Sequence, residues 1–557
     1  MKTQTEIHYM LVDPGAAGDG VPSVTTKQPW VNVSQLHDED DTHVMAKWGT
    51  LEPGQFVLDG TAAMFPDDPA AQDMGLWSAG MSGADGRFAA PPVLTVAFSQ
   101  PHTSLGITFV FAEPTGDWCD DLHLAWYDAA GAVLAEQDFA PDSASYFCDR
   151  LVHDYYKVVA TFRKTNKPRR YLKLFRVRYG VVEHLTGGGL TEASLLEEAD
   201  PTSMTVSVNT LRFGFYADRR FDLLDLTGVY AVFQQQQRVR VRQAVDGVTR
   251  EMGLFYTDVP EVQDERVVTI DCIDLVGVLG QTEYLGGLWL DGITAGALIR
   301  EIMTSADAAA YYDLAPSLAG IVIKGYLPIC THREALQQVA FALGAVVSCA
   351  RSDKIRIYPL PPATSTITPH DKAAGHRQVQ RGYVSGVEVY THNYVPARDV
   401  TELFKATCKA GTEFVRFSSP AASLSCSGAT IVESGVNYAK LNVPAAGQVV
   451  LSGKPYDDQT SLGGSVYAAV MPAGARASVK TVEDCTLTAD PQAVAQGLYD
   501  FYQQRIEDTG DLFPVDAAAG EVVRVETAGS HTLTGMVESL DIDLLGGGIA
   551  KAVVAGG

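Results

Sequence analysis

Carboxylates and tryptophans lie close together in one stretch of the sequence, where they could bind a sugar. Asp117, Asp120 and Asp121 surround Trp118 in the run GDWCDDL. An indole ring can stack on the apolar face of a sugar, and carboxylates can accept hydrogen bonds from its hydroxyls. With Trp77 added, the predicted glycan site comprises Trp77, Trp118, Asp120 and Asp121. The alternative is that the tryptophans are core residues of a β-sandwich.

Arginines gather in two short runs, although the chain as a whole is acidic. The first, RKTNKPRRYLKLFRVR, spans 163–178, and the second, RVRVR, spans 238–242. The second run, and the second half of the first, alternate charged with apolar residues, as a strand with one buried face does. We expect the charged faces to contact acidic neighbouring subunits, and a solvated face explains them equally well. The predicted interface residues are Arg169, Arg170, Arg176, Arg178, Arg238, Arg240 and Arg242.

Acidic and apolar residues alternate near the C-terminus, in SLDIDLL. Leu540, Ile542 and Leu544 would lie on a buried face, and Asp541 and Asp543 on the opposite one. We expect the two aspartates to line a lumen through which DNA slides without binding, because like charges repel. A solvated strand face is the alternative.

The motifs of common enzyme classes are missing. The sequence has no HExxH, GxSxG, Walker A or GxGxxG motif, so it is predicted not to be an enzyme. The glycines of 187–189 could cradle a phosphate, but they lie between predicted domains, which favours a hinge. The acidic run Asp38–Asp41 with His43 could hold a cation, and a solvated loop is the simpler interpretation. We predict no cofactor and no metal. A glycan-processing enzyme remains an alternative, because paired carboxylates can converge in space alone.

Length and charge restrict the class of protein. A chain of 557 residues is expected to form several domains, and its apolar content of 46% is typical of a globular protein. The net charge of −25 argues against sequence-specific nucleic acid and anionic membranes as partners. No segment has the apolar length of a membrane anchor.

Cysteine use indicates the compartment. The eight cysteines are scattered without metal-binding spacing, which favours free buried thiols in a reducing compartment. A disulfide between Cys119 and Cys148 is the alternative. The N-terminus lacks the apolar core of a signal peptide, so we expect synthesis and folding in the cytoplasm.

The chain is predicted to be mainly β with α+β insertions, in several domains. Short alternating strands with regular turn signals predict a jelly-roll sandwich first, and later β-rich stretches flank an α/β unit. In MTVSVNTLRFGF the apolar register slips at Asn209, which predicts a bulge or bend within one strand. The predicted segments are an N-terminal arm or linker with one possible strand at 7–12 (1–45), the jelly roll (46–180), a first β-barrel (181–290), an α/β connector (291–365), a second β-rich domain (366–489) and a C-terminal helix with strands that complete the barrels (490–557).

The clearest local signals lie in and after the connector. Thr331 and Glu334 have the spacing of a capping box, and Gly344 is placed to end the helix. Two apolar runs flank Arg351–Lys354, which predicts a hairpin. Asp490, followed by proline, predicts the start of a further helix.

Three pieces of the chain, in this order, resemble the tail-tip or baseplate hub proteins of tailed phages. They are SLLEEADPTSMTVSVNTLRF, the unit from TAGALIREIM to KGYLPICTHREALQQVAFALGAVV, and the closing segments LYDFYQQRI, EVVRVET and LTGMVESLDIDLLGGGIAKAVV. The resemblance spans 185–557. Separately, FVLDG (56–60), GLWSAGMSGADGRF (75–88) and RYLKLFRVRYG (170–180) together resemble discoidin-like carbohydrate-binding modules.

The resemblance implies a virion structural protein, assembled in the host cytoplasm, that forms a ring at the tail tip or baseplate. Three subunits, each with two hub-type β-barrels, would cap the tail tube and seat a spike or fibres. The implied partners are the distal tail protein, the tail tube, the tape measure and the spike or fibre proteins, with host glycans as a contact of the jelly roll. The extra N-terminal jelly roll departs from the family pattern and raises the alternative of a hexameric distal tail protein. A soluble lectin that binds sugar through 46–180 alone is a further alternative.

Overall fold

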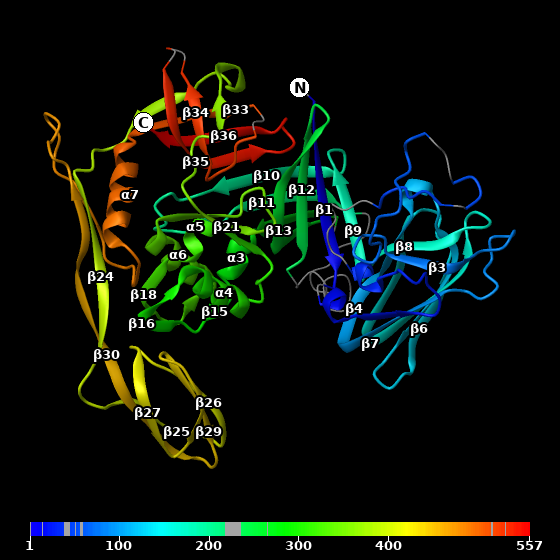
Figure 1. Ribbon diagram of the computed structural model, residues 1–557, viewed down its shortest axis with the longest axis horizontal. Helices are drawn as coiled ribbons and strands as arrows, with labels where there is room; N and C mark the ends of the chain where they lie inside the picture. The colour runs from blue at the N-terminus through cyan, green and yellow to red at the C-terminus, as the bar shows by residue number, and fades with distance from the viewer. Residues whose placement is uncertain are drawn as a thin grey trace.

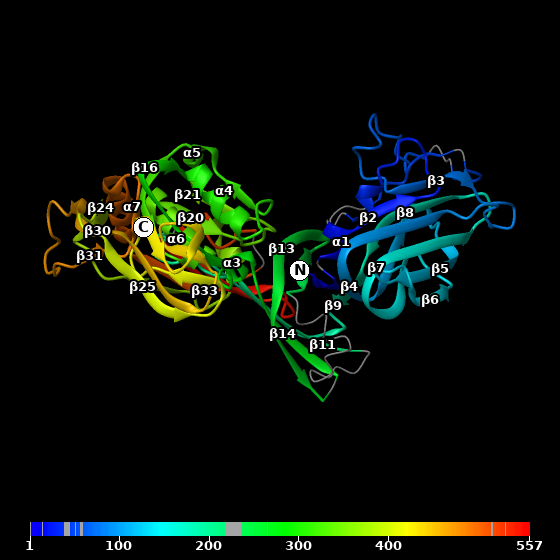
Figure 2. The same ribbon diagram turned by 90° about the horizontal axis from the view of Figure 1, so that it is seen from below.

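The computed structural model describes residues 2–13, 15–37, 45–50, 52–55, 59–217, 236–264, 266–513, 516–527, 529 and 531–557. The chain is mainly β, as predicted, with 54% strand and 12% helix. An N-terminal lobe lies at one end of the elongated molecule, and a large sheet joins it to the connector and a further β lobe (Figures 1 and 2). The acidic run Asp38–Asp41 and His43 lie outside the described residues.

The N-terminal lobe is built on a seven-stranded sheet that encloses one core. Its strand order is β3-β8-β4-β7-β5-β6, with β2 paired to β4. Side chains from both ends of this order, such as Trp77, Trp126 and Phe139, belong to a single apolar cluster, so the sheet closes over itself as a sandwich does. The strands are β2 (Val21–Val24), β3 (Leu76–Met81), β4 (Val93–Phe111), β5 (Cys119–Tyr127), β6 (Val133–Phe139), β7 (Ser145–Thr165) and β8 (Tyr171–Arg178).

A thirteen-stranded sheet forms the centre of the molecule. Its main path is β23-β33-β36-β35-β10-β11-β14-β13-β12-β1-β9, and β34 joins β22 to β35. The strands are β1 (Thr3–Val12), β9 (Gly180–Thr186), β10 (Leu190–Glu198), β11 (Thr210–Tyr216), β12 (Arg238–Val245), β13 (Val248–Gln263), β14 (Val267–Ile273), β22 (Ser365–Ile367), β23 (Arg377–Gln380), β33 (Ile506–Leu512), β34 (Val522–Glu526), β35 (Thr532–Asp543) and β36 (Ile549–Gly556).

Two halves of this sheet meet at one strand pair. β10 runs antiparallel to β35, with Leu195 opposite Ile542 and Leu196 opposite Asp541. Side chains from both halves, including Ile7 from β1 and Val554 from β36, pack into one apolar cluster. The strands before and after the connector therefore form one continuous sheet over a shared core.

Two expectations for this sheet need correction. The possible strand at 7–12 is present as part of β1, but it does not belong to an arm, because it lies between β9 and β12 and buries Ile7 and Tyr9 completely. The predicted bulge at Asn209 does not lie inside a strand, because β11 begins at Thr210. The preceding apolar residues, Val206 and Val208, pack instead against the core of the connector.

The connector follows its sequence signals closely. Thr331 accepts a hydrogen bond from the Glu334 amide and Glu334 accepts one from the Thr331 amide, so the capping box of α6 is complete, and Gly344 ends the helix in the left-handed conformation. The elements are α3 (Leu275–Leu279), β15 (Glu283–Tyr284), β16 (Gly287–Thr294), α4 (Ala295–Ser305), β17 (Tyr312–Leu314), α5 (Pro316–Ala319), β18 (Val322–Leu327), β19 (Cys330–Thr331), α6 (His332–Leu343), β20 (Ala345–Ser348) and β21 (Ile355–Pro359). β20 and β21 form the predicted hairpin.

A further β lobe projects from the connector side of the molecule (Figure 1). Its long strand β30 pairs with β24, β25 and β27, and a separate sheet has the order β26-β29-β28. Most of the predicted second β-rich domain thus lies outside the large sheet. The elements are β24 (Gly386–Pro396), β25 (Thr401–Cys408), β26 (Gly411–Arg416), β27 (Ala421–Ser427), β28 (Thr430–Ser434), β29 (Tyr438–Val443), β30 (Gly447–Tyr467) and β31 (Val479–Val482). They are followed by β32 (Leu487–Thr488), which pairs with β18 of the connector, and by α7 (Pro491–Gln503).

Candidate functional site

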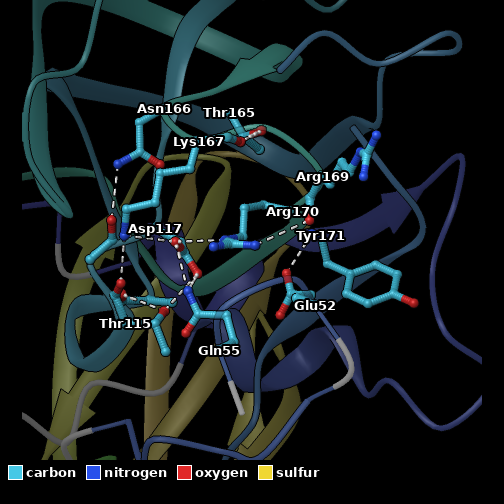
Figure 3. Close-up of polar contacts among 12 residues, drawn as sticks. Glu52, Gln55, Thr115, Asp117, Thr165, Asn166, Lys167, Arg169, Arg170 and Tyr171 are labelled. Atoms are coloured by element: carbon cyan, nitrogen blue, oxygen red, sulfur yellow. Dashed lines mark hydrogen bonds and ion pairs between the residues drawn. The ribbon is translucent and has the colours of Figure 1, made fainter. Parts of the chain in front are cut away.

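Asp117 is the centre of a buried polar network in the N-terminal lobe. It follows a short 3-10 turn, and Gly116 brings it inward with a φ of 58°. Its carboxylate accepts from Lys173 Nζ at 2.9 Å and from Lys167 Nζ at 3.1 Å. Thr115 Oγ1 donates to it at 2.8 Å, and Figure 3 shows Lys167 and Arg170 converging on the same carboxylate. The cluster holds the loop after β4 against β8.

A second carboxylate ties a distant loop to the same lysine. Lys173 Nζ lies 2.7 Å from Glu52 Oε2, and the two side chains are 1% and 0% exposed. Glu52 also accepts from the backbone N–H of Tyr171 at 2.8 Å and from the hydroxyl of Thr50 at 2.7 Å. A buried ion pair is stabilised when hydrogen bonds fill its remaining capacity, and both carboxylate oxygens of Glu52 have such partners.

The network is a poor candidate for acid–base chemistry. Burial alone would raise the pKa of Asp117, but Lys173 and hydrogen bonds from Thr115 and Lys167 outweigh burial and leave this pKa lowered. A general acid at neutral pH needs the opposite shift. The geometry instead fixes two loops on the lobe.

Five aromatic rings form a continuous strip beside this network. Trp48 lies 6.0 Å from Phe65, Phe65 lies 5.5 Å from Trp30, and Trp30 lies 5.7 Å from Trp77. Tyr171 lies 6.3 Å from Trp77 and ends the strip. Lys173 Nζ lies 5.2 Å from the ring of Trp77, so the strip rests on the ion-pair network.

The strip is partly open to solvent. Phe65 is 40% exposed and the neighbouring Met64 is 81% exposed, while Trp30 and Trp48 are half-buried. Exposed aromatic groups of this kind commonly mark contact sites. Trp77, at 3% exposure, forms the floor of the strip.

The residues of the predicted glycan site have other partners. Trp77 is a core residue, so its ring offers no open face to a sugar, which corrects its predicted role. Trp118 is half-buried and donates from Nε1 to the Pro141 carbonyl at 3.1 Å. Asp120 binds Lys164 at 2.7 Å, and Asp121 binds both Arg87 and Arg163. Sugar binding by Trp118, Asp120 and Asp121 stays a prediction.

Two of the seven predicted interface arginines are used within the lobe. Arg170 lies 3.4 Å from Asp117, Arg176 binds Asp73, and both arginines are buried. These two are corrected to internal contacts, because a buried, paired guanidinium cannot reach a neighbour. Arg169 is exposed, and Arg178 is half-buried at the end of β8.

The arginines of β12 lie on one face of the large sheet. Arg242 binds Glu251 at 2.6 Å, Arg240 is buried with the same glutamate at 3.5 Å, and Arg238 donates to the hydroxyl of Tyr311 at 3.0 Å. Arg240, buried and paired, is therefore also corrected to an internal contact, whereas the role of Arg238 and Arg242 as contacts to a partner stays a prediction. On β35, Asp541 and Asp543 are exposed while Leu540 and Ile542 are buried, so the predicted alternation is confirmed and the lumen assignment stays untested.

The functional residues that sequence reasoning missed are Glu52, Lys173 and the aromatic residues of the loops. Lys173 carried a signal, because it interrupts the apolar run YLKLF, in which Tyr171 is half-buried and the other four residues are buried. Glu52, Trp48 and Phe65 come from a loop without regular alternation, so only the folded chain brings them to β3 and β8. The burial that raises the pKa of the Cys119 thiol to about 12 fits the expected free cysteines, and all eight are free.

Within the described part of the chain, no three His, Cys, Asp or Glu side chains gather as metal ligands. None of the described helices is long and apolar enough to cross a membrane.

No family model and no curated protein matches the sequence. Several solved structures have a similar course of the chain. The 43 kDa tail protein of prophage MuSo2 from Shewanella oneidensis is 11% identical, with a TM-score of 0.37 over 67% of this chain and 95% of that one. The prophage tail protein gp18 from Listeria monocytogenes is 8% identical, with a TM-score of 0.39 over 67% of this chain and 91% of that one. A tail protein from Neisseria meningitidis is 10% identical, with a TM-score of 0.39 over 67% of this chain and 93% of that one. With TM-scores below 0.5, these likenesses leave function to be argued from the chain itself.

Proposed function

We propose that the chain is a non-enzymatic structural subunit of a phage tail tip or baseplate hub. It would form a ring that caps the tail tube and seats a spike or fibres. The observation that carries this proposal is the large sheet, whose two halves join through β10 and β35 into one surface with open ends. The three hub-like sequence segments support the same function, since the outer segments supply strands on both sides of that joint.

The two ends of the large sheet are suited to contact with neighbouring copies. β9 and β23 are terminal strands, and no other described strand pairs with their outer edges. Open strand edges aggregate unless another chain covers them, and a closed ring covers each edge with a neighbour. The amide of Arg381 donates to the Arg505 carbonyl of the adjoining segment, so the amide of Gln380, one residue earlier, points to the open side.

The native mass of the purified full-length chain, combined with electron micrographs, tests the ring. A trimer with a central hole is expected. A hexamer would favour the distal tail protein instead, and a monomer at every concentration would contradict self-assembly. Gln380→Pro removes the outward amide of β23 without removing an internal hydrogen bond and should shift the chain toward monomer. Gln380→Ala is the control and should leave the mass unchanged.

The proposed neighbours are the distal tail protein, the tail tube, the tape measure and the spike or fibre proteins. Asp541 and Asp543 would face the lumen of the ring, where their charge would keep DNA from adhering. If so, Asp541→Lys combined with Asp543→Lys should leave ring assembly intact and make the rings retain DNA at low salt. Rings that retain no DNA would place these aspartates on the outside.

A second proposed function is saccharide binding by the aromatic strip of the N-terminal lobe. Trp48 and Phe65 offer partly open rings, and Lys47 with Thr61 lies beside Trp48 as a hydrogen-bonding pair, Nζ to Oγ1 at 3.0 Å. Ring faces next to such groups are suited to the alternating apolar and hydroxyl surfaces of a sugar.

Binding of the full-length chain to host cell-wall glycans tests this second function. Trp48→Ala should weaken binding by up to about tenfold, since one aromatic contact contributes roughly 0.5–1.5 kcal/mol. Trp118→Ala is the matched variant from the originally predicted site. If Trp118→Ala weakens binding and Trp48→Ala does not, the site lies at Trp118, Asp120 and Asp121.

A further inference from the structure

The N-terminal lobe and the large sheet are joined at two chain crossings that touch each other. The chain leaves the sheet after Val12 and returns to it at Gly180. Between them, the amide of Asp13 donates to the Tyr179 carbonyl at 2.9 Å. A Cβ on Gly180, whose φ is 147°, would lie 2.0 Å from the Leu11 carbonyl oxygen, so only glycine allows this approach. Figure 2 shows α1 (Ala16–Asp19) and β9 together at this junction.

One histidine of β4 binds carboxylates on both sides of its ring at this junction. His102 Nδ1 lies 2.9 Å from Asp13 Oδ2, and Nε2 lies 3.1 Å from Asp19 Oδ2. The side chains of His102 and Asp13 are 9% and 10% exposed. Asp13 directly follows a strand of the large sheet, whereas Asp19 and His102 belong to the N-terminal lobe.

This geometry defines the protonation state of the imidazole. An ionised carboxylate only accepts hydrogen bonds, so each ring nitrogen facing one must carry a proton. Hydrogen bonds from Ser99, then from His102, lower the pKa of Asp19 to about 2, so this carboxylate is ionised at any ordinary pH. When both carboxylates are ionised, the two contacts place both ring nitrogens as donors, which requires the doubly protonated imidazole.

The other side chains around the ring do not compete for this role. Phe98 lies 4.9 Å from the imidazole and Tyr155 lies 6.3 Å from it, and burial raises the pKa of Tyr155 well above the neutral range. The nearby His37 has its pKa lowered by burial and pairs with the hydroxyl of Tyr179 at 2.8 Å. The charges that face His102 are thus those of Asp13 and Asp19.

The carboxylates also organise the backbone on both sides. Asp13 accepts from the amides of Gly15 at 2.9 Å and Thr103 at 3.3 Å. Asp19 accepts from the amides of Ser99 at 2.8 Å and Gln100 at 3.1 Å. The histidine thus connects two hydrogen-bonded turns, one leading out of the large sheet and one within β4.

We propose that His102 is a proton-dependent clamp that fixes the orientation of the N-terminal lobe relative to the large sheet. With its second proton, His102 attracts both aspartates and closes the junction. When that proton leaves as the pH rises, one nitrogen presents a lone pair to a carboxylate, and the contact becomes repulsive. The clamp is therefore closed at the lower pH and loosens at the higher pH, until protonation of the aspartates opens it again in strong acid. This proposal is independent of ring formation, because all its groups lie within one chain.

Nitrogen NMR of the wild-type chain tests the protonation state directly. With ¹⁵N-labelled histidine, both ring nitrogens of His102, which face two carboxylates, should still show the cationic signature at a pH where His123, which faces one exposed carboxylate, shows the neutral one. His102→Gln assigns the signal. A neutral tautomer at that pH overturns the proposal, whether or not any variant folds.

Hydrogen exchange tests the consequence for the junction. In His102→Gln the amides of Gly15, Ser99, Gln100 and Thr103 should exchange about tenfold faster, since a neutral amide cannot attract both carboxylates. His123→Gln is the matched control, because His123 pairs at 2.7 Å with a single exposed carboxylate, Asp138, in the same lobe. In the wild type the same amides should lose protection as the pH rises. This loss is what remains after the exchange rates are corrected for the intrinsic increase of amide exchange with pH. Equal exchange in the two variants, or no loss of protection with pH, overturns the proposal.

Discussion

One basic residue of the N-terminal lobe and one of the large sheet lie in opposite environments. In the lobe, Lys173 is enclosed between Glu52 and Asp117, within 2.9 Å of both. In the sheet, Arg212 lies on an open face with its side chain 42% exposed, and binds Asp271 at 2.8 Å. Removing a charge from water costs several kcal/mol and requires full pairing, whereas an exposed pair is hydrated and screened. Lys173 therefore holds loops of its own lobe in place, while Arg212 stays accessible to solvent and to other molecules.

The largest effect is expected when the enclosed lysine is replaced. Lys173→Met leaves Glu52 and Asp117 buried without their shared cation, which should destabilise the N-terminal lobe by about 3–5 kcal/mol. The measurement is the free energy of opening at the Tyr171 amide, obtained from hydrogen exchange of the full-length chain. Local exchange is preferable to a single melting curve, because a chain of several lobes need not unfold in one step.

A lysine at the rim of the same lobe provides the control. Lys164 binds Asp120 at 2.7 Å, but both side chains are partly exposed. Lys164→Met should cost about 0–1 kcal/mol. If the two lysine variants cost the same, burial is not what distinguishes the network, and the comparison between the lobe and the sheet breaks down.

A pH change should act on the two regions with opposite sign. The pKa of Asp117 is lowered on folding, so its contribution to stability is present above the ordinary value of about 3.9 and is lost as the pH falls through the folded value. Burial raises the pKa of Asp274, at the end of β14, to about 6. Its contribution is therefore present below about pH 3.9 and is lost as the pH rises through about 6.

Lowering the pH from about 7 to about 5 should thus increase protection around Asp274 and leave the surroundings of Asp117 unchanged. The amides of Asn209 and Gly277, which donate to Asp274 at 3.0 Å each, report the first region. The amide of Tyr171 reports the second. Exchange rates corrected for the intrinsic effect of pH give the measurement, and Asp274→Asn should abolish the gain. Unchanged protection at Asn209 over this range would show that Asp274 stays ionised.

The sequence alone predicts those structural features that are decided by residues close together in the chain. Capping at Thr331 and the hairpin at Arg351 are decided within a few positions, and both are confirmed. The alternation around Asp541 is confirmed for the same reason, because one strand decides which of its faces is buried.

The parts of the fold and of the candidate site that the sequence does not predict depend on contacts between distant segments. The same apolar alternation in β1 is consistent with an arm or an inner strand, and only its pairing with β9 and β12 decides. Glu52 and Lys173 are 121 positions apart by their numbering, so no local spacing connects them. Trp77 and Trp48 illustrate the same limit, since one is closed off by the fold and the other is left partly open.

The smallest effect is expected on the open face of the sheet. Arg212 also lies within 3.4 Å of Glu192 and 3.6 Å of Glu261, so Arg212→Gln removes a cation from three carboxylates. Because water hydrates them all, the cost should be only about 0–1 kcal/mol, and added salt should reduce it further. Hydrogen exchange at the β11 amides, with and without added salt, measures the free-energy cost of Arg212→Gln and its reduction by salt.

The salt dependence of these free-energy costs distinguishes the open face of the sheet from the lobe, even if the two variants cost similar amounts. Salt screens exposed charges but does not reach a pair enclosed by protein, so the cost of Lys173→Met should stay constant while that of Arg212→Gln shrinks. If Arg212→Gln instead costs several kcal/mol and ignores salt, another copy of the chain covers this face in solution. Repeating the measurement at lower protein concentration would then restore the small, salt-sensitive cost, because dilution separates the copies.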